Sequence, residues 1–304
     1  MLVTSLLGNG QRLDGGALFG NAARTVWSRW LAPDELGRVS LSCRALLVEH
    51  HGVRTLFETG IGAFFSPELR ERYGVLEDRH VLLESLAAIG LSDADIDRVV
   101  LSHLHFDHAG GLLLPYAPGV PPALAFPRAE FVVGRQAFER AERPHPRDRA
   151  SFIPELTALL RASGRLRLLD TPSAGRLLLG EGFDFRETDG HTPGMLHGRV
   201  RGRQAGLLFC ADLVPGTAWV HAPITMGYDR FAERLVDEKS EWLAECASDG
   251  TYFMYTHDPS FAASRVTLDA RGRYTPTDRL GEFTRWDLDR SSAPAAEATR
   301  VPSE

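Results

Sequence analysis

The most constraining feature of this 304-residue sequence is the run His-Leu-His-Phe-Asp-His at residues 103–108, which follows the apolar stretch Arg98-Leu101. β-Branched and apolar residues predict a buried strand over that stretch, so the run lies where the strand emerges. Imidazole and carboxylate groups are ligands that divalent transition metals accept, and four of them within six positions are hard to place without a cation. The run therefore predicts a metal site at the end of a buried strand.

The local backbone suggests how these side chains are arranged. Side chains alternate in an extended segment, so we expect His103 and His105 to face one way and Leu104 and Phe106 to face the core. Asp107 and His108 are adjacent in the run. The glycines at 110–111 that follow predict a turn whose backbone packs closely below the site. Neighbouring ligands can thereby serve two different metals.

A divalent centre needs about four to six donors, so further ligands are expected downstream. His191, Asp212 and His257 each follow a short predicted strand. A turn-capping or solvated side chain is the alternative for each one alone, but it is less convincing for all three together. These three residues are therefore the candidates that complete the site.

The motifs occur in the order found in the metallo-β-lactamase superfamily, which the sequence resembles from about residue 41 to residue 265. They are the HxHxDH run, Gly-His-Thr-Pro-Gly at 190–194, Ala-Asp-Leu at 211–213 and Thr-His-Asp-Pro at 256–259. The resemblance implies two divalent metals, the first held by His103, His105 and His191, the second by Asp107, His108 and His257, with Asp212 bridging both.

Two positions depart from the usual pattern of the superfamily. Many relatives have a histidine directly after the Gly-His-Thr-Pro-Gly turn, whereas this chain has Met195 there and a histidine only at His197. Glu58 stands where relatives often have an aspartate that supports the ligands. Both departures concern the surroundings of the metals and leave the ligand set complete.

The order of predicted elements indicates an α+β fold, a four-layer αββα sandwich formed by one domain over residues 1–290 with an N-terminal hairpin and aromatic segment. The tail 291–304, rich in Ala, Pro and Ser, is expected to be disordered. Strands are predicted at 39–48, 54–58, 98–101, 130–133, 165–169, 183–188, 198–201, 206–210, 251–255 and 265–268, with a turn at 50–52. Helices are predicted at 81–89, 134–142, 151–162 and 230–246, and a short helical start at 92–97.

Composition excludes several classes of protein. Apolar residues make up 43% and charged residues 24%, which is typical of a globular chain, and a net charge of −6 argues against nucleic-acid binding. Without a long apolar run or a signal peptide, we expect a cytoplasmic protein that contacts no membrane. The three widely spaced cysteines indicate buried, reduced thiols.

Two adjacent cations would supply a bridging hydroxide and polarise a carbonyl or phosphoryl oxygen, so the expected reaction is hydrolysis. Asp107 is the natural group to orient that hydroxide and move its proton. A set of imidazole and carboxylate ligands without a thiolate favours zinc, with iron, manganese or cobalt as alternatives.

The chain lacks room for the clamp domain of RNA-processing members or the flavodoxin domain of flavin-coupled members. Residues 13–20 and 27–30, with residues 226–229, resemble the N-acyl-homoserine lactonase branch, which implies a small-molecule substrate with an apolar acyl group and a possible homodimer. Tyr228 could then donate a hydrogen bond to the carbonyl oxygen or the leaving alkoxide. Four aromatic side chains could line an acyl slot or belong to the core: Phe19, Trp27, Trp30 and Trp219.

Three alternatives remain open. A thioesterase or a phosphoesterase could use the same centre, although related thioesterases carry a basic C-terminal helical module that the residues after Leu268 do not resemble. A non-catalytic metal-binding module is disfavoured because every ligand position is filled.

Overall fold

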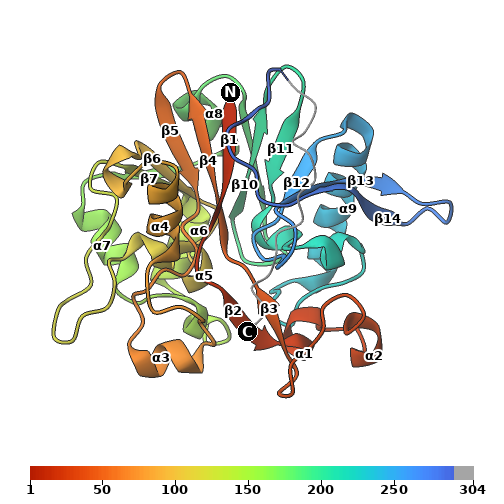
Figure 1. Ribbon diagram of the computed structural model, residues 1–304, viewed down its shortest axis with the longest axis horizontal. Coiled ribbons are helices and arrows are strands. Elements are labelled where there is room, and N and C mark those ends of the chain that lie inside the picture. The colour runs from red at the N-terminus through yellow and green to blue at the C-terminus, as the bar shows by residue number, and fades with distance from the viewer. Residues whose placement is uncertain (291–304) are drawn as a thin grey trace.

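The computed structural model describes residues 1–290, so the tail predicted to be disordered lies outside the described residues. Its centre is two β-sheets that face each other (Figure 1). The seven-stranded sheet has the order β15-β1-β4-β5-β6-β7-β8 and the six-stranded sheet the order β14-β13-β12-β11-β10-β9, while β2 and β3 pair separately. The strands are β1 Leu2–Leu7, β2 Gln11–Asp14, β3 Arg38–Leu41, β4 Arg44–His50, β5 Val53–Phe57, β6 Arg98–Leu101, β7 Glu130–Gly134, β8 Leu166–Leu169, β9 Phe183–Thr188, β10 Met195–Arg201, β11 Gly206–Phe209, β12 Tyr252–Met254, β13 Ala263–Leu268, β14 Tyr274–Leu280 and β15 Trp286–Asp287.

Strand β4 shows why the chain forms layers, because both of its faces are buried. Leu46 and Val48 belong to the core between the two sheets. Ala45 and Leu47 point to the opposite face and join a second core beneath the helices. A strand that is apolar on both faces needs a layer on each side. The predicted four-layer αββα sandwich, the metallo-β-lactamase fold, is therefore confirmed.

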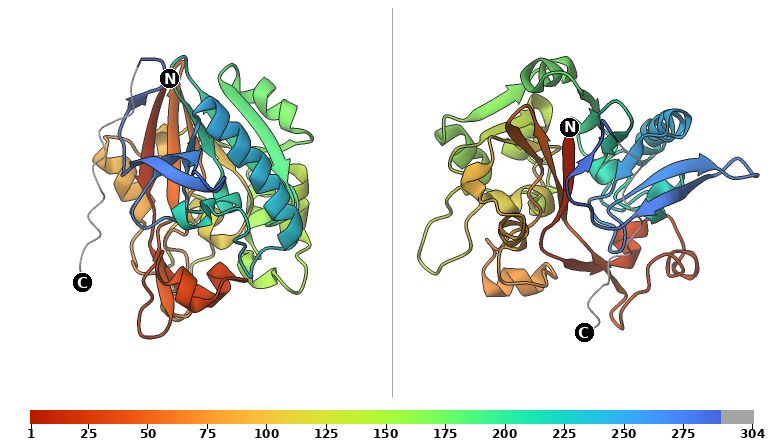
Figure 2. Two further views of the ribbon diagram at one scale, coloured as in Figure 1. Left: turned by 90° about the vertical axis from the view of Figure 1, so that its right-hand side faces the viewer. Right: turned by 45° about the horizontal axis from the view of Figure 1, so that its top comes forward.

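Helices cover the outer faces of the sheets. The second core joins α4, α6 and α7 to the seven-stranded sheet, whereas α9 packs on β13. Helix α8 instead contacts β9 at Phe185, whose ring lies 6.3 Å from that of Phe57 in the facing sheet. Figure 2 shows α9 running along the outside of the six-stranded sheet. The helices are α1 Gly15–Phe19, α2 Arg24–Trp27, α3 Pro67–Arg72, α4 Val81–Ala88, α5 Phe106–Ala109, α6 Arg135–Glu142, α7 Leu156–Ala162, α8 Pro172–Leu179 and α9 Ala232–Asp249, and short 3₁₀ turns occur at Asp93–Asp95, Gly110–Leu112, Arg149–Ser151, Ala211–Leu213 and Thr217–Val220.

The turn predicted at 50–52 is confirmed. Strands β4 and β5 pair antiparallel with His50 opposite Val53, so the loop contains only His51 and Gly52. Both have positive φ, 50° and 77°, which is the backbone that a tight two-residue hairpin requires.

The single strand predicted over 39–48 is wrong, because the chain breaks between β3 and β4. Strand β3 pairs with β2, while β4 lies in the seven-stranded sheet. At the break, the backbone of Ser42 and Arg44 bonds to the segment that carries His257. Hydrophobic pattern alone does not show this change of sheet, because the backbone contacts that cause it come from residues far along the chain.

Helix boundaries also differ from the prediction. Helix α7 begins at Leu156 and not at residue 151, because Pro154 disfavours helical backbone at Ile153 before it. Helix α9 ends later than predicted, at Asp249, where Gly250 adopts the left-handed conformation and its N–H bonds to the carbonyl of Cys246.

The three cysteines, Cys43, Cys210 and Cys246, are free and buried, as predicted. In the described part of the chain, no helix combines the length and the apolar character needed to cross a membrane.

Candidate metal centre

The run 103–108 lies directly after β6, where the chain leaves the seven-stranded sheet and turns into α5. Leu104 is buried in the core, as predicted, but Phe106 is only partly buried and lines a cavity. Phe106 still packs against the core that contains Leu104, so the expectation is confirmed for Leu104 and only in part for Phe106, because the alternation ends when α5 begins at Phe106. Backbone packs on backbone here: a Cβ on Gly110 would lie 2.3 Å from the carbonyl oxygen of Ile61, and one on Gly111 would lie 2.1 Å from that of Thr59.

One group of buried side chains contains His103, His105, His191 and Asp212, with one candidate ligand atom from each within 4.8 Å of the others. Nδ1 of His105 lies 2.9 Å from Nε2 of His103 and 3.3 Å from Nε2 of His191. Oδ2 of Asp212 lies 3.1 Å from Nε2 of His191. Three histidines and a carboxylate thus converge from the ends of β6, β9 and β11.

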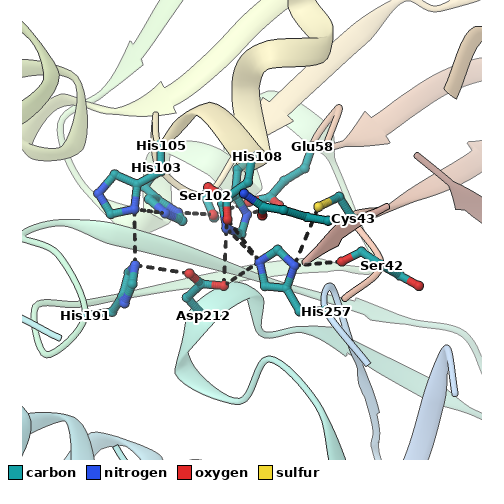
Figure 3. Close-up of polar contacts among 12 residues, drawn as sticks. Ser42, Cys43, Glu58, Ser102, His103, His105, His108, His191, Asp212 and His257 are labelled. Atoms are coloured by element: carbon teal, nitrogen blue, oxygen red, sulfur yellow. Dashed lines mark hydrogen bonds and ion pairs between the residues drawn. The ribbon is translucent and has the colours of Figure 1, made fainter. Parts of the chain in front are cut away.

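A second group contains Asp107, His108 and His257, with candidate ligand atoms again within 4.8 Å of one another. Nε2 of His108 and Nε2 of His257 are 3.2 Å apart, and each lies 3.2 Å from Oδ1 of Asp212. Oδ2 of Asp107 lies 3.5 Å from Nε2 of His257. Asp212 therefore faces one group with each carboxylate oxygen (Figure 3).

The outer nitrogens of four histidines are held by groups behind the cluster. Nδ1 of His108 contacts Glu58, and Nδ1 of His103 contacts Ser102. Nδ1 of His191 lies 2.9 Å from Asp229, and Nδ1 of His257 lies 2.8 Å from the carbonyl oxygen of Ser42. An imidazole that donates at Nδ1 can present a lone pair at Nε2 when a cation replaces any proton there, so these four nitrogens can bind metal.

Electrostatics favours positive charge at the centre. Burial lowers the pKa of His108, but the carboxylates of Glu58, Asp212 and Asp107 outweigh burial and hold that pKa well above its ordinary value. Burial opposes ionisation of Asp212, yet the surrounding histidines hold its pKa well below the usual range. Burial, assisted by the neighbouring histidines, lowers the pKa of His103 far enough to keep it neutral. Oδ1 of Asp212 is also buried without a hydrogen-bond partner. This donor set fits divalent cations.

Helix α9 and the segment before it hold the turn that carries His191. The carboxylate of Glu238 accepts hydrogen bonds from the backbone N–H groups of Asp189 and Gly190, both at 2.9 Å. A Cβ on Gly190 would lie 2.4 Å from Cα of Leu235, so only glycine allows this approach. These contacts hold the turn in place against α9.

A cavity of about 160 Å³ opens above the cluster and has a mainly apolar wall. Leu13, Leu18, Leu41 and Met226 contribute to that wall. Tyr73, Phe106 and Ala150 line this cavity and also a neighbouring one of about 520 Å³. The two spaces therefore adjoin, and together they can hold an apolar chain longer than the first alone.

Tyr228 lines the cavity above the cluster, together with Asp107. Although the side chain of Tyr228 is 41% exposed, partial desolvation of its hydroxyl and the nearby charge of Asp107 raise the pKa of Tyr228, so the hydroxyl keeps its proton at neutral pH. It can therefore act as a hydrogen-bond donor.

The slot suggested for the four aromatic residues is wrong. Phe19 stacks on Trp27 and Trp219 at ring-centroid distances of 5.5 and 4.7 Å, and these three are buried in the large hydrophobic cluster that also contains the core between the sheets. Trp30 stacks on His221 at 4.9 Å. None of the four lines the cavity above the cluster.

His197 does not belong to the cluster. It is buried in β10, where Nε2 lies 2.7 Å from Oγ1 of Thr188, and burial lowers the pKa of His197 to about 3.

Sequence reasoning gave no role to Ser102 or Asp229. Ser102 directly precedes His103, and its position at the end of a predicted strand could have drawn attention to it. Asp229 contacts His191, from which it is separated by 38 positions in the sequence. No local sequence pattern indicates this contact.

The family model of the metallo-beta-lactamase superfamily matches residues 40–260, so the chain belongs to this superfamily. The class predicted from the sequence, a metal-dependent hydrolase, is thereby confirmed. A probable metal-dependent hydrolase from Staphylococcus aureus has a similar fold, with a TM-score of 0.79 at 23% identity over 91% of this chain and 97% of that one.

Two lactone-opening enzymes also share the fold. AidC, a dizinc quorum-quenching lactonase in complex with the product N-hexanoyl-L-homoserine, gives a TM-score of 0.71 at 20% identity over 90% of this chain and 93% of that one. An N-acyl homoserine lactone hydrolase, with the product N-hexanoyl-L-homoserine bound at its catalytic metal centre, gives a TM-score of 0.62 at 16% identity over 84% of this chain and 93% of that one.

Proposed function

We propose that this protein uses two divalent metal ions to open the ring of an N-acyl-homoserine lactone or a similar lactone. The two metal groups are those brought together around Asp212, with zinc as the favoured metal. The observation that carries the proposal is the position of Asp212, whose two carboxylate oxygens lie 3.1–3.2 Å from histidines of both groups.

Two divalent cations, when held by these residues, would lower the pKa of water toward neutrality and polarise the carbonyl group under attack. The side chains of this chain supply the remaining functions. Asp107 lies at the floor of the cavity beside His257, where its carboxylate orients the attacking water and accepts its proton. The water oxygen bonds to the carbonyl carbon, the ring C–O bond breaks, and the departing alkoxide takes up the proton that Asp107 received from the water, which gives a hydroxy acid.

Tyr228 is proposed to donate a hydrogen bond to the carbonyl oxygen or to the departing alkoxide. It lines the same cavity as Asp107, and the raised pKa of its hydroxyl keeps the proton that this role requires.

The apolar wall of the cavity supports a substrate with an apolar acyl group. We propose that the lactone ring lies in the cavity beside the candidate ligands and that the acyl chain passes Tyr73 and Phe106 into the adjoining cavity. A net charge of −6 is compatible with a neutral substrate and unfavourable for a phosphodiester polyanion. The two lactone-opening enzymes of the same fold make this substrate class the first to test.

A substrate panel tests the proposal directly. The zinc-loaded protein is assayed with N-acyl-homoserine lactones, a glutathione thioester and a phosphodiester, with metal content measured in the same sample. Lactones should give the highest kcat/KM. Rapid cleavage of the thioester or phosphodiester without lactone opening would leave the fold intact and refute the proposed substrate.

A further inference from the structure

Lys239 is the only lysine of a chain whose other basic side chains, apart from histidine, are all arginines. It lies on α9 and is fully buried. A buried cation is costly unless polar groups replace the water that it loses, so the partners of Lys239 indicate what it does in the fold.

The ammonium of Lys239 bonds to the segment 221–229, which follows the 3₁₀ turn Thr217–Val220 and leads to α9. Nζ donates hydrogen bonds to the carbonyl oxygens of His221, at 3.4 Å, and Ile224, at 2.5 Å. The backbone N–H of Ile224 also bonds to the carbonyl of His221, at 3.0 Å, so these residues form a turn. Lys239 therefore closes this turn from α9.

The same segment carries residues of the site. Met226 and Tyr228 line the cavity above the cluster. Oδ2 of Asp229 accepts a hydrogen bond from the backbone N–H of Met226, at 2.6 Å. Burial lowers the pKa of Lys239 to about 7, and the negative charge of Asp229 opposes this shift. Lys239 thus interacts with the segment at both ends, through hydrogen bonds at 221–224 and through charge at Asp229.

Helix α9 holds a second part of the site with the preceding residue. Glu238 accepts the hydrogen bonds from the backbone of Asp189 and Gly190 that hold the turn of His191. Lys239 holds the segment 221–229. Two neighbouring residues of one helix therefore set the position of that segment relative to a candidate metal ligand.

Tyr228 depends on this segment for its position. Within residues 1–290, its hydroxyl makes no hydrogen bond, so the backbone on either side determines where the hydroxyl lies. A displacement of about 1 Å at a reacting group can lower turnover by about 100-fold, even when the cause is remote. Contacts that hold the segment 221–229 therefore affect turnover although they touch no substrate.

We propose that Lys239 is a positioning residue that fastens the segment 221–229 to α9 and so keeps the hydroxyl of Tyr228 in the cavity. This inference rests on the proposed function, in which Tyr228 donates a hydrogen bond to the substrate.

Lys239→Met is the sharpest substitution, because methionine keeps an unbranched apolar side chain but has no hydrogen-bond donor. The carbonyl groups of His221 and Ile224 then lose a partner, and the segment should open more often. Amide hydrogen–deuterium exchange, measured by mass spectrometry, should be about tenfold faster over 221–229 than in wild type and unchanged in the turn 189–191. This measurement needs neither metal nor substrate.

Turnover is the second measurement. In zinc-loaded protein with a lactone substrate, Lys239→Met should lower kcat by about tenfold, with KM and bound zinc close to wild type. In a Tyr228→Phe background, Lys239→Met should cause little further loss, because the hydroxyl that it positions is already absent.

Arg199→Met is the matched control. Arg199 is another buried cation that pairs with α9, through Nη1 and Oε1 of Glu245 at 2.6 Å, but it lies on β10 and does not contact the segment 221–229. The control should leave exchange over 221–229 unchanged, and any loss of kcat should be the same with and without Tyr228→Phe.

Wild-type exchange over 221–229 in Lys239→Met would overturn the inference, irrespective of the substrate. An equal loss of kcat in both backgrounds would show a general effect on the fold and overturn it as well. If Lys239→Met fails to fold, Lys239→Gln, which keeps a donor on a shorter side chain, should show smaller changes in the same direction, and wild-type exchange in that variant counts equally against the inference. A wild-type protein that opens no lactone would instead refute the proposed substrate, and the exchange measurement would still decide whether Lys239 holds the segment.

Discussion

The metal cluster and the cavity above it are built in different ways. Every candidate ligand in the cluster follows the end of β6, β9, β11 or β12, strands that a buried sandwich holds firmly. The cavity is lined largely by connecting segments, including Tyr73 after α3, Ala150 in a 3₁₀ turn and Tyr228 before α9. In the proposed function, the chemistry therefore belongs to the rigid part of the fold, and substrate preference to loops that can change without moving the candidate ligands. Changes in the cluster should affect all substrates alike, whereas changes in the cavity should alter only the preference among them.

Asp212→Ala should have the largest effect. Both groups lose a shared carboxylate, so turnover of every substrate should fall by more than ~1000-fold, because water activation and carbonyl polarisation fail together. Bound metal should fall from two ions per chain to one or fewer, as measured by elemental analysis. Asp249→Ala removes a carboxylate that pairs with Arg201 away from the cluster and should change neither quantity. A stoichiometry near one in wild type, unchanged in Asp212→Ala, would contradict the two-metal arrangement.

Asp107→Asn should lower kcat by at least ~100-fold, the usual scale for a group positioned to transfer a proton. Asparagine keeps the size and one oxygen, so the fold should persist, as checked by circular dichroism. The assay must use metal-replete protein. Near-normal kcat in such a sample would show that Asp107 does not have the proposed role.

Tyr228→Phe should lower kcat by about tenfold, the size expected for one lost hydrogen bond to developing charge. The loss should be the same for short and long acyl chains, because the hydroxyl contacts only the reacting end. A loss that depends on chain length would instead place Tyr228 in the acyl-binding surface.

The smallest effect concerns how kcat/KM depends on the length of the acyl chain of the substrate. Each methylene buried in the adjoining cavities contributes about 0.8 kcal/mol, so kcat/KM should rise roughly fourfold per methylene until the space is filled. Tyr73→Ala should flatten this rise, because Tyr73 lines both cavities. Trp27→Ala serves as the control: it should cost about 3–5 kcal/mol of stability as a buried aromatic but leave the slope unchanged. A flattened slope in Trp27→Ala alone would reverse the assignment of core and cavity.

The sequence predicted the sandwich and the convergence of the candidate ligands because both depend on local patterns. Apolar strands end in histidine or aspartate, and strand ends in one sandwich meet at a common edge. The contacts around the candidate ligands and the lining of the cavity could not be predicted from the sequence in the same way. Whether Trp27 lies in the core or in a slot depends on Phe19 and Trp219, the latter nearly two hundred positions away. Contacts such as Asp229 with His191 likewise depend on the tertiary fold, which no spacing of residues shows.

The close backbone contact at Gly110 and Gly111 has a consequence for laboratory evolution. Any side chain at either position would push the carbonyl groups of Ile61 or Thr59 away and move the α5 turn that carries Asp107 and His108. Mutant libraries aimed at new substrates should therefore hold these glycines constant. Diversity belongs in the loop around Ala150, whose side chain borders both cavities and none of the candidate ligand groups. The protein then offers a fixed reaction centre beneath an exchangeable surface, so new specificities can be selected without rebuilding the chemistry.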